Sequence, residues 1–136
     1  MRAAVFVGDP ENLAIEQLTP SPPGPRDVVV EVGASGVCHS DLSIMRGYLP
    51  AMPGMVLGHE GTGRIVEVGA EVSRVKKGDR VVASFVPACG ACWHCLRDES
   101  ELCERTMDVI MQMRGTRTDG STYLCMAGSS APTPAS

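Results

Sequence analysis

The sequence predicts one small domain that is mainly β, built as a barrel or sandwich, with a short helix and a separate cysteine-rich lobe. Several valine-rich runs have the length of strands, and the chain's 15 glycines and 10 prolines mark the turns between them. The lobe is predicted because four of the six cysteines fall within one short segment. A chain of 136 residues is long enough to bury a core of its own.

The predicted elements follow from local composition. The strands are predicted over the β-branched runs 2–7, 12–18, 27–34, 63–70 and 80–86. One helix is predicted over 40–47, where Ser40 or Asp41 caps the start and Gly47 ends it. Residues 121–136 finish in small, polar and proline residues, and we expect them to form a disordered or truncated tail.

Charge and hydropathy exclude several classes of partner. The net charge is −4 and lysine and arginine form no cluster, which argues against nucleic acid and anionic membranes as partners. No apolar run is long enough to cross a bilayer. Asp9 and Pro10 interrupt the apolar N-terminal run, which is typical of a strand rather than of a secretion signal. We therefore expect a cytoplasmic protein, in which thiols stay reduced.

The segment 87–104 carries the strongest chemical signal. Cys89, Cys92, Cys95 and Cys103 have the spacing C-x2-C-x2-C-x7-C, and small residues between the first two ease a tight turn. Four thiolates at this spacing can form the tetrahedron that zinc prefers, with Zn–S distances of about 2.3 Å. A site closed by four thiolates has no open position, so the spacing predicts a structural zinc that contributes to folding.

Other uses of clustered cysteines fit less well. Paired disulfides suit a secreted protein, and no secretion signal is present. Ferredoxin-type runs end in C-x3-C-P, whereas Cys103 lies further along and precedes Glu104. The CWHC pair lacks the βαβ setting of a thioredoxin-type motif. An iron–sulfur cluster is the alternative to zinc, and Trp93 and His94 are expected to be loop residues rather than ligands.

Two further residues have ordinary interpretations when taken alone. Cys38 follows a predicted strand and could be a small buried thiol, and His59 lies in a glycine-rich turn. The run HEGTG lacks the second histidine of a metalloprotease helix. Cys125 is left without an assignment: it is either a buried thiol or a substitute metal ligand.

Several motifs together carry more information than either residue alone. GVCHSDLSIMRG, PGMVLGHEGTGRIVEVG, GDRV and the four-cysteine segment occur in this order along the chain. This arrangement resembles the N-terminal GroES-like catalytic domain of zinc-dependent medium-chain alcohol dehydrogenases, over about residues 1–120. The resemblance implies a GroES-like barrel with a four-cysteine zinc lobe, and it implies two zinc ions, one structural and one catalytic.

The resemblance also implies roles for individual residues. Cys38 and His59 would be ligands of the catalytic zinc, and Glu60 would be a neighbouring carboxylate or an occasional ligand. Asp41 would hydrogen-bond the imidazole and fix its tautomer. Ser40 would take the proton of the alcohol.

The cofactor side of the site is implied in the same way. His39 would contact the pyrophosphate of NAD(P), and the reaction would be hydride transfer from the alcohol to the nicotinamide. In many relatives a histidine follows the serine three residues later, where this chain has Ser43. Small alcohols and aldehydes are the implied partners, with a homo-oligomer as an option for the full-length enzyme.

The resemblance leaves two parts of the family pattern unmatched. No G-x-G-x-x-G motif occurs, and the family's third catalytic-zinc ligand and Rossmann domain lie beyond this chain. The sequence therefore predicts an N-terminal fragment of an alcohol dehydrogenase whose independent activity is doubtful. The alternative is a stand-alone zinc-binding GroES-like module without catalysis.

Overall fold

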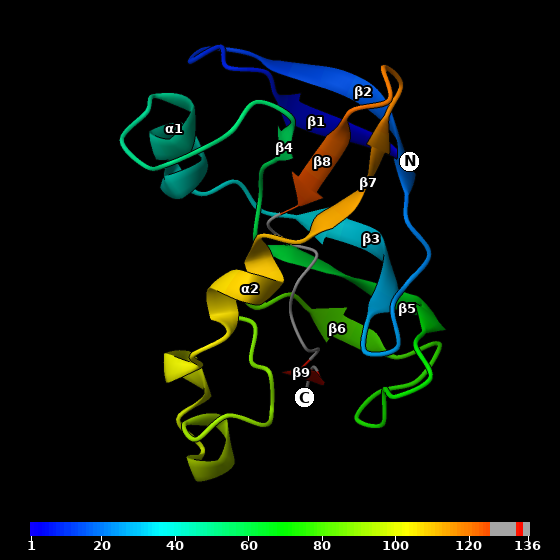
Figure 1. The fold of residues 1–136 in the computed structure, drawn as a ribbon. Coiled ribbons are helices and arrows are strands. Elements are labelled where there is room, and N and C mark those ends of the chain that lie inside the picture. Colours follow the sequence, from blue (N-terminus) through cyan, green and yellow to red (C-terminus); the bar gives the residue numbers. More distant parts are fainter. Residues whose placement is uncertain (126–132, 135–136) are drawn as a thin grey trace.

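Strands dominate the computed structural model, which describes residues 1–125 and 133–134. They form a closed five-stranded barrel and a separate four-stranded sheet, as Figure 1 shows. The short helices lie outside both sheets, and the four-cysteine segment extends away from them. The predicted mainly β fold, a barrel with short helices and a cysteine-rich lobe, is confirmed.

The barrel combines the N-terminal strands with strands from after the four-cysteine segment. Its strands, in spatial order, are β1 (Arg2–Phe6), β2 (Leu13–Pro20), β7 (Met113–Arg117), β8 (Thr122–Cys125) and β4 (Met55–Val56). Every neighbouring pair is antiparallel except β4 and β8, which are parallel. A closed barrel leaves no exposed strand edge, so strands remote in sequence stabilise one another.

Alternation along β2 places the barrel core. Leu18 is 1% exposed and packs with Val5 and Tyr123, whereas Ile15, on the opposite face of the same strand, is 67% exposed. A second cluster centred on Phe6 and Leu124 extends this core. Burial therefore alternates along β2 with a period of two, but apolar side chains lie on both faces, so composition alone does not identify the buried one.

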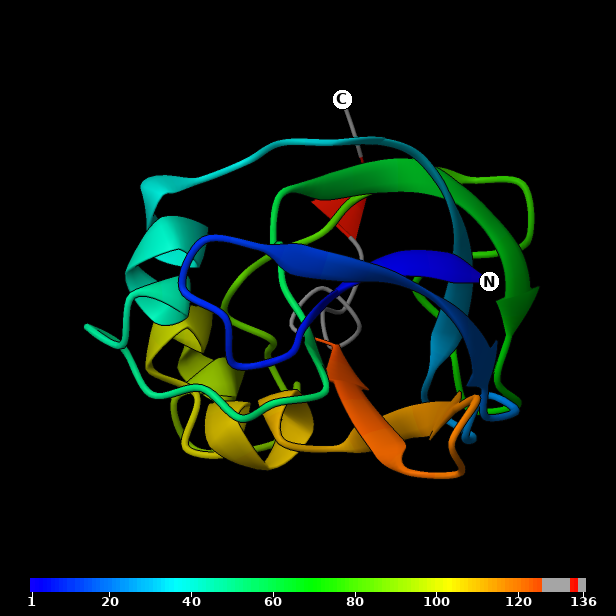
Figure 2. The same cartoon turned by 90° about the horizontal axis from the view of Figure 1, so that it is seen from above.

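The second sheet has the order β3 (Val28–Ser35), β5 (Gly61–Val68), β6 (Arg80–Val82) and β9 (Thr133–Pro134). Its own core consists of Ile65, Val75 and Val81. Figure 2 shows β3 and β5 curving along one side of the molecule, with β7 and β8 on the opposite side. Register shifts occur in the β3–β5 pair near its centre.

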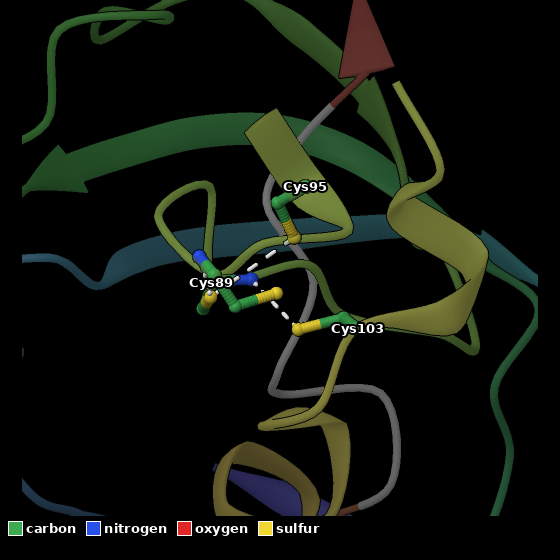
Figure 3. Close-up of side chains that lie close together, drawn as sticks. Cys89, Cys95 and Cys103 are labelled. Carbon is green, nitrogen blue, oxygen red and sulfur yellow. Dashed lines mark hydrogen bonds between the residues drawn. The ribbon is translucent and has the colours of Figure 1, made fainter. Parts of the chain in front are cut away.

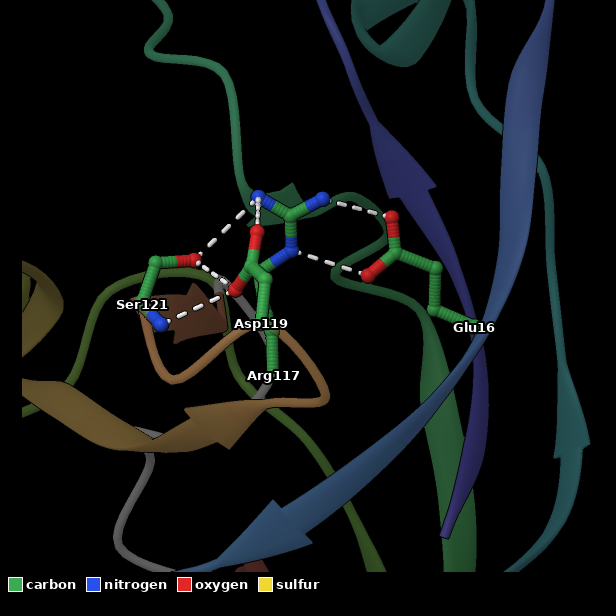
Figure 4. A network of polar contacts seen from close by, with 4 residues as sticks. All are labelled: Glu16, Arg117, Asp119 and Ser121. Carbon is green, nitrogen blue, oxygen red and sulfur yellow. Dashed lines mark hydrogen bonds and ion pairs between the residues drawn. The ribbon is translucent and has the colours of Figure 1, made fainter.

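A polar network ties β2 to the hairpin between β7 and β8 (Figure 4). Arg117 donates two hydrogen bonds to the carboxylate of Glu16, from Nε at 2.8 Å and from Nη2 at 2.6 Å. Asp119 and Ser121 complete the network from the turn. This bidentate ion pair fixes the position of the hairpin relative to β2.

The structure corrects two boundaries near the end of the chain. The predicted strand over 80–86 ends at Val82. The tail predicted from residue 121 includes β8, where Tyr123 is 1% exposed, so the barrel continues beyond the predicted domain end at residue 120. The rest of that tail lies outside the described residues, apart from β9. Burial of Tyr123 against Val5 and Leu18 outweighs the polar composition around it.

The helix prediction is correct in place but not in its cap. Helix α1 (His39–Met45) has Cys38 as its N-cap, not Ser40 or Asp41. The Cys38 sulfur accepts the backbone N–H of Ser40 at 3.5 Å, and the Asp41 side chain accepts the backbone N–H of Cys38. The pair forms a capping box in which a thiol takes the usual place of a hydroxyl.

Three short helical turns follow β6 along the chain, within and just after the four-cysteine segment. They are η1 (Cys95–Arg97), η2 (Ser100–Leu102) and α2 (Thr106–Ile110). In the part of the chain that the structure describes, no helix combines the length and apolar character needed to cross a membrane.

Candidate metal centres

The four cysteines of the lobe converge on one point. One sulfur from each of Cys89, Cys92, Cys95 and Cys103 lies within 4.8 Å of all the others. The Cys89 and Cys95 sulfurs are 4.0 Å apart. A zinc tetrahedron with Zn–S distances of about 2.3 Å has S–S edges of about 3.8 Å, so the Cys89–Cys95 separation is close to such an edge and the cluster suits a zinc ion.

Backbone amides hold these sulfurs in place. Figure 3 shows the sulfurs of Cys89, Cys95 and Cys103 facing one another. The Cys89 sulfur accepts the N–H groups of Ala91 and Cys92 at 3.4 and 3.3 Å, and the Cys89 N–H is donated to the Cys103 sulfur at 3.3 Å. Amide donors aimed at sulfur favour the thiolate form, which is the form that binds metal.

The same environment shifts the pKa values of Cys92, Cys95 and Cys103 in different directions. The backbone N–H of Cys95 lowers the pKa of Cys92 to about 6, while burial raises the pKa of Cys95 to about 11. Burial also raises the pKa of Cys103, but backbone donors led by Cys89 outweigh it and the net shift is downward. Four thiolates this close repel one another, and a divalent cation is what holds all four deprotonated.

The contacts around the sulfurs address two questions: whether the cysteines pair as disulfides, and whether Trp93 or His94 belongs to the ligand cluster. All six cysteines lie in the described chain and none forms a disulfide. His94 is engaged elsewhere, since its Nδ1 lies 2.9 Å from the Glu99 carboxylate and its ring meets Trp93 edge-on. Arg97 stacks over Trp93 at 4.5 Å. These contacts place Trp93 and His94 in the loop around the sulfurs and outside the ligand cluster.

A second cluster forms where β3 ends and β5 begins. Cys38, His59 and Glu60 each bring one ligand atom to within 4.8 Å of the other two. The backbone N–H of Gly36 is donated to the carbonyl of Glu60 at 3.0 Å, which continues the β3–β5 pairing up to the cluster. The sheet therefore brings together two segments that are separated in sequence.

Asp41 fixes both segments. It is 8% exposed and accepts two backbone N–H groups, from Cys38 at 3.0 Å and from Gly58 at 3.1 Å. Gly58 has φ of +99°, which favours glycine immediately before His59. The same carboxylate lies 3.8 Å from the His59 Nδ1, a separation longer than a hydrogen bond.

His59 has an unfilled hydrogen-bonding position. Its Nδ1 is buried and has no hydrogen-bond partner, and its side chain is 13% exposed. A buried ring nitrogen without a partner costs free energy, so a ligand that engages the ring and draws it toward Asp41 would remove that cost. The residues of this cluster therefore fit a metal ion: a thiol, an imidazole and a carboxylate form a donor set typical of zinc.

Phe85 was not singled out in the sequence. Its ring lies 5.0 Å from the His59 ring at an interplanar angle of 57°, and it is 50% exposed beside the cluster. The sequence placed Phe85 inside a predicted strand, where an aromatic residue is unremarkable. Its one distinguishing feature in the sequence is its position just before the four-cysteine segment.

The remaining predicted residues surround Cys38. Ser40 is half-buried, with its Oγ 3.5 Å from the Cys38 sulfur. His39 is exposed and its Nδ1 lies 3.3 Å from the Ser43 Oγ. Cys125 lies in β8 opposite Val56. In the described part of the chain, Cys125 belongs to neither group of potential ligands.

Comparisons with known proteins agree with this fold and these clusters. Residues 24–131 match the family model for the alcohol dehydrogenase GroES-like domain. An alcohol dehydrogenase of Schizosaccharomyces pombe is 38% identical over 137 residues, which cover 96% of this chain and 38% of that protein. The chain belongs to the alcohol dehydrogenase GroES-like domain family.

Solved structures show the same relationship. An alcohol dehydrogenase zinc-binding domain protein from Burkholderia ambifaria matches with a TM-score of 0.83 and 30% identity, over 92% of this chain and 35% of that one. A cobalt- and zinc-bound thermostable alcohol dehydrogenase from Pyrobaculum aerophilum matches with a TM-score of 0.69 and 34% identity, over 78% and 32%. The chain thus spans well under half the length of the relatives it matches.

Proposed function

We propose that this chain is the catalytic-domain part of a zinc-dependent alcohol dehydrogenase, which interconverts an alcohol and its aldehyde or ketone with a nicotinamide cofactor. The observation that carries the proposal is the convergence of Cys38, His59 and Glu60 at the junction of β3 and β5. The family membership supports the reaction class, and the donor set supports the metal.

The two clusters differ in the way that structural and catalytic zinc sites differ. Four cysteines close the first cluster, so a zinc ion there has no position left for a substrate. The second cluster offers three donors, and Glu60 is exposed to solvent. A metal ion held by three side chains keeps a position for an alcohol oxygen, where it supplies Lewis-acid chemistry.

The chain's own residues would then handle the proton. Ser40 lies beside Cys38 and would relay the proton that the alcohol loses, accepting it while releasing its own hydroxyl proton toward water. Ser43 and His39, 3.3 Å apart and close to solvent, offer the next acceptors towards water. A protonated His39 would also offer a positive charge and an N–H donor to the phosphates of NAD or NADP. Asp41 would hold the Cys38 and Gly58 backbones in position and would accept a hydrogen bond from the His59 imidazole if the ring moved closer than its present 3.8 Å.

Cobalt spectroscopy tests this proposal directly. Zinc first fills the four-cysteine cluster, and Co²⁺ is then titrated into the 136-residue chain, because thiolate–Co²⁺ complexes absorb visible light and zinc complexes do not. We expect one further Co²⁺ to bind with thiolate character, and a primary alcohol or its aldehyde to change the spectrum. Cys38→Ser should abolish the thiolate band, while Cys125→Ser, the matched control, should leave it unchanged.

The opposite result is equally clear. If the zinc-filled chain takes up no Co²⁺, or if its Co²⁺ spectrum does not respond to alcohol or aldehyde, the catalytic assignment is wrong. The chain would then be a zinc-binding module without a substrate site.

A further inference from the structure

Gly36, which none of the sequence motifs assigns to the metal, lies directly beneath the Glu60 side chain. A Cβ built on Gly36 would lie 2.1 Å from Glu60 Oε2, 3.1 Å from Glu60 Cβ and 3.2 Å from Glu60 Cδ. All three of the nearest atoms belong to Glu60. Real side chains do not approach this closely, so any residue larger than glycine would compete with the carboxylate for the same space.

The backbone at Gly36 does not by itself require glycine. Its φ lies outside the left-handed range, whereas several other glycines, including Gly58, have clearly positive φ. An alanine could adopt the Gly36 conformation without backbone strain. The steric reason for glycine here is therefore the carboxylate above it, and not the turn.

The position of that carboxylate matters for the cluster. Glu60 is exposed, and a glutamate in water samples many rotamers unless something restricts it. The backbone of Glu60 is fixed by the hydrogen bond from the Gly36 N–H to its carbonyl at 3.0 Å. With the backbone fixed, the carboxylate occupies the space that a side chain at Gly36 would fill. In this position one carboxylate oxygen lies within 4.8 Å of ligand atoms of Cys38 and His59.

We infer that Gly36 is a positioning residue for the second metal cluster: it admits the Glu60 carboxylate as a metal donor. The inference rests on the proposed metal site of Cys38 and His59, and it adds a residue that touches neither the metal nor the substrate. Replacing Gly36 by alanine should remove the Glu60 donor without altering the thiol or the imidazole.

The chain offers a matched control for this substitution. Gly33 lies in β3, three residues before Gly36, which directly follows the end of that strand. Its φ is ordinary, and a Cβ there would meet only the Thr62 carbonyl oxygen at 3.9 Å, an ordinary contact. Gly33→Ala therefore introduces the same methyl group into the same segment without reaching Glu60, and any general effect of an alanine on this segment should appear in both variants.

The experiment is a double-mutant cycle read by Co²⁺ affinity, with zinc already in the four-cysteine cluster. We expect Gly36→Ala to weaken Co²⁺ binding about 10-fold, as Glu60→Ala does, and to shift the Co²⁺ bands in the same direction. Gly33→Ala should leave affinity and spectrum unchanged. In the Glu60→Ala background, Gly36→Ala should have no further effect, because the two changes remove the same donor.

Each other outcome overturns the inference. Unchanged affinity in Gly36→Ala means that Glu60 reaches the metal without the space over Gly36, and unchanged affinity in Glu60→Ala means that it is not a donor. An undiminished loss from Gly36→Ala in the Glu60→Ala background means that the methyl group acts through the backbone. If Co²⁺ binds but Cys38→Ser and His59→Ala do not affect it, the proposed site itself fails, which is a separate result.

Discussion

The carboxylate of Asp41 accepts the backbone N–H of Cys38 at 3.0 Å, and through its other oxygen it holds the loop that carries His59. One buried side chain therefore connects the start of helix α1 with the residue before the imidazole. The spacing between the thiol and the imidazole depends on both bonds. A side chain with one acceptor in place of two cannot maintain them.

Asp41→Asn tests this dependence. The asparagine amide nitrogen would face a backbone N–H, leaving a buried donor unsatisfied, so we expect a loss of about 2 kcal/mol in the free energy of unfolding. Affinity for Co²⁺ at the second cluster should fall about 10-fold, since the two ligand segments lose their shared anchor. Urea unfolding and Co²⁺ titration measure the two effects.

The control for this variant is Asp108→Asn, whose side chain is 69% exposed in a solvent-facing ion pair. It should change neither quantity measurably. Equal unfolding midpoints for Asp41→Asn and the unmodified chain would show that the buried carboxylate does not anchor the two loops.

The two metal clusters should differ in how tightly they hold zinc. The four cysteines come from one short segment, whereas the second cluster has three donors from two segments. We expect the purified chain to keep about one zinc per molecule after mild chelation. Cys95→Ser should lose this zinc and be less stable, and His59→Ala should retain it. Metal analysis of the two variants measures this. If His59→Ala lost the tightly bound zinc and Cys95→Ser retained it, the structural and catalytic roles assigned to the two clusters would be reversed.

The barrel core should dominate stability through β2. Leu18 is 1% exposed between Val5 and Tyr123, so Leu18→Ala should lower the free energy of unfolding by about 3 kcal/mol. Ile15→Ala removes a comparable side chain from the 67%-exposed face of the same strand and should cost less than about 0.5 kcal/mol. Urea denaturation of the zinc-loaded variants measures both. Similar losses in the free energy of unfolding at the two positions would show that Leu18 and Ile15 do not lie on a buried and an exposed face of β2.

The contact between Glu16 and Arg117 predicts a particular response to acid. The hydrogen bonds from Arg117 lower the pKa of Glu16 below its ordinary value of 4.5. A carboxyl group with a lowered pKa in the folded state stabilises the fold above its unfolded pKa, and this contribution disappears as the pH falls through the folded value. The stabilisation should therefore be complete at neutral pH and decline below about pH 4.5.

Glu16→Gln isolates this contribution from the other acids. We expect the variant to be less stable than the unmodified chain at neutral pH, with the difference shrinking at pH values below 4.5. Glu31→Gln, at an exposed position on β3, serves as the control and should leave the free energy of unfolding at neutral pH unchanged within error. Free energies of unfolding measured across the acid range test this, and a difference independent of pH would argue against the ion pair.

The sequence by itself determined the parts of this protein that are local. The spacing of Cys89, Cys92, Cys95 and Cys103 was enough to predict their convergence, because a tight turn brings neighbouring sulfurs together without help from the rest of the fold. The β-branched runs located β1, β2, β3, β5 and β6, but not the buried face of β2, because Leu18 and Ile15 are both apolar and lie on opposite faces. The order of the motifs indicated the family.

Only the tertiary structure decided what depends on contacts between distant segments. Strand β8 has little strand signal of its own, and it is ordered because Tyr123 is buried against β1 and β2. The capping by Cys38 is local, but the second Asp41 bond, from the Gly58 N–H, joins residues 17 positions apart and forms only because the fold brings α1 to the loop before β5. The Gly36–Glu60 contact has the same origin, since a steric conflict between two residues far apart in sequence arises only when the sheet pairs them.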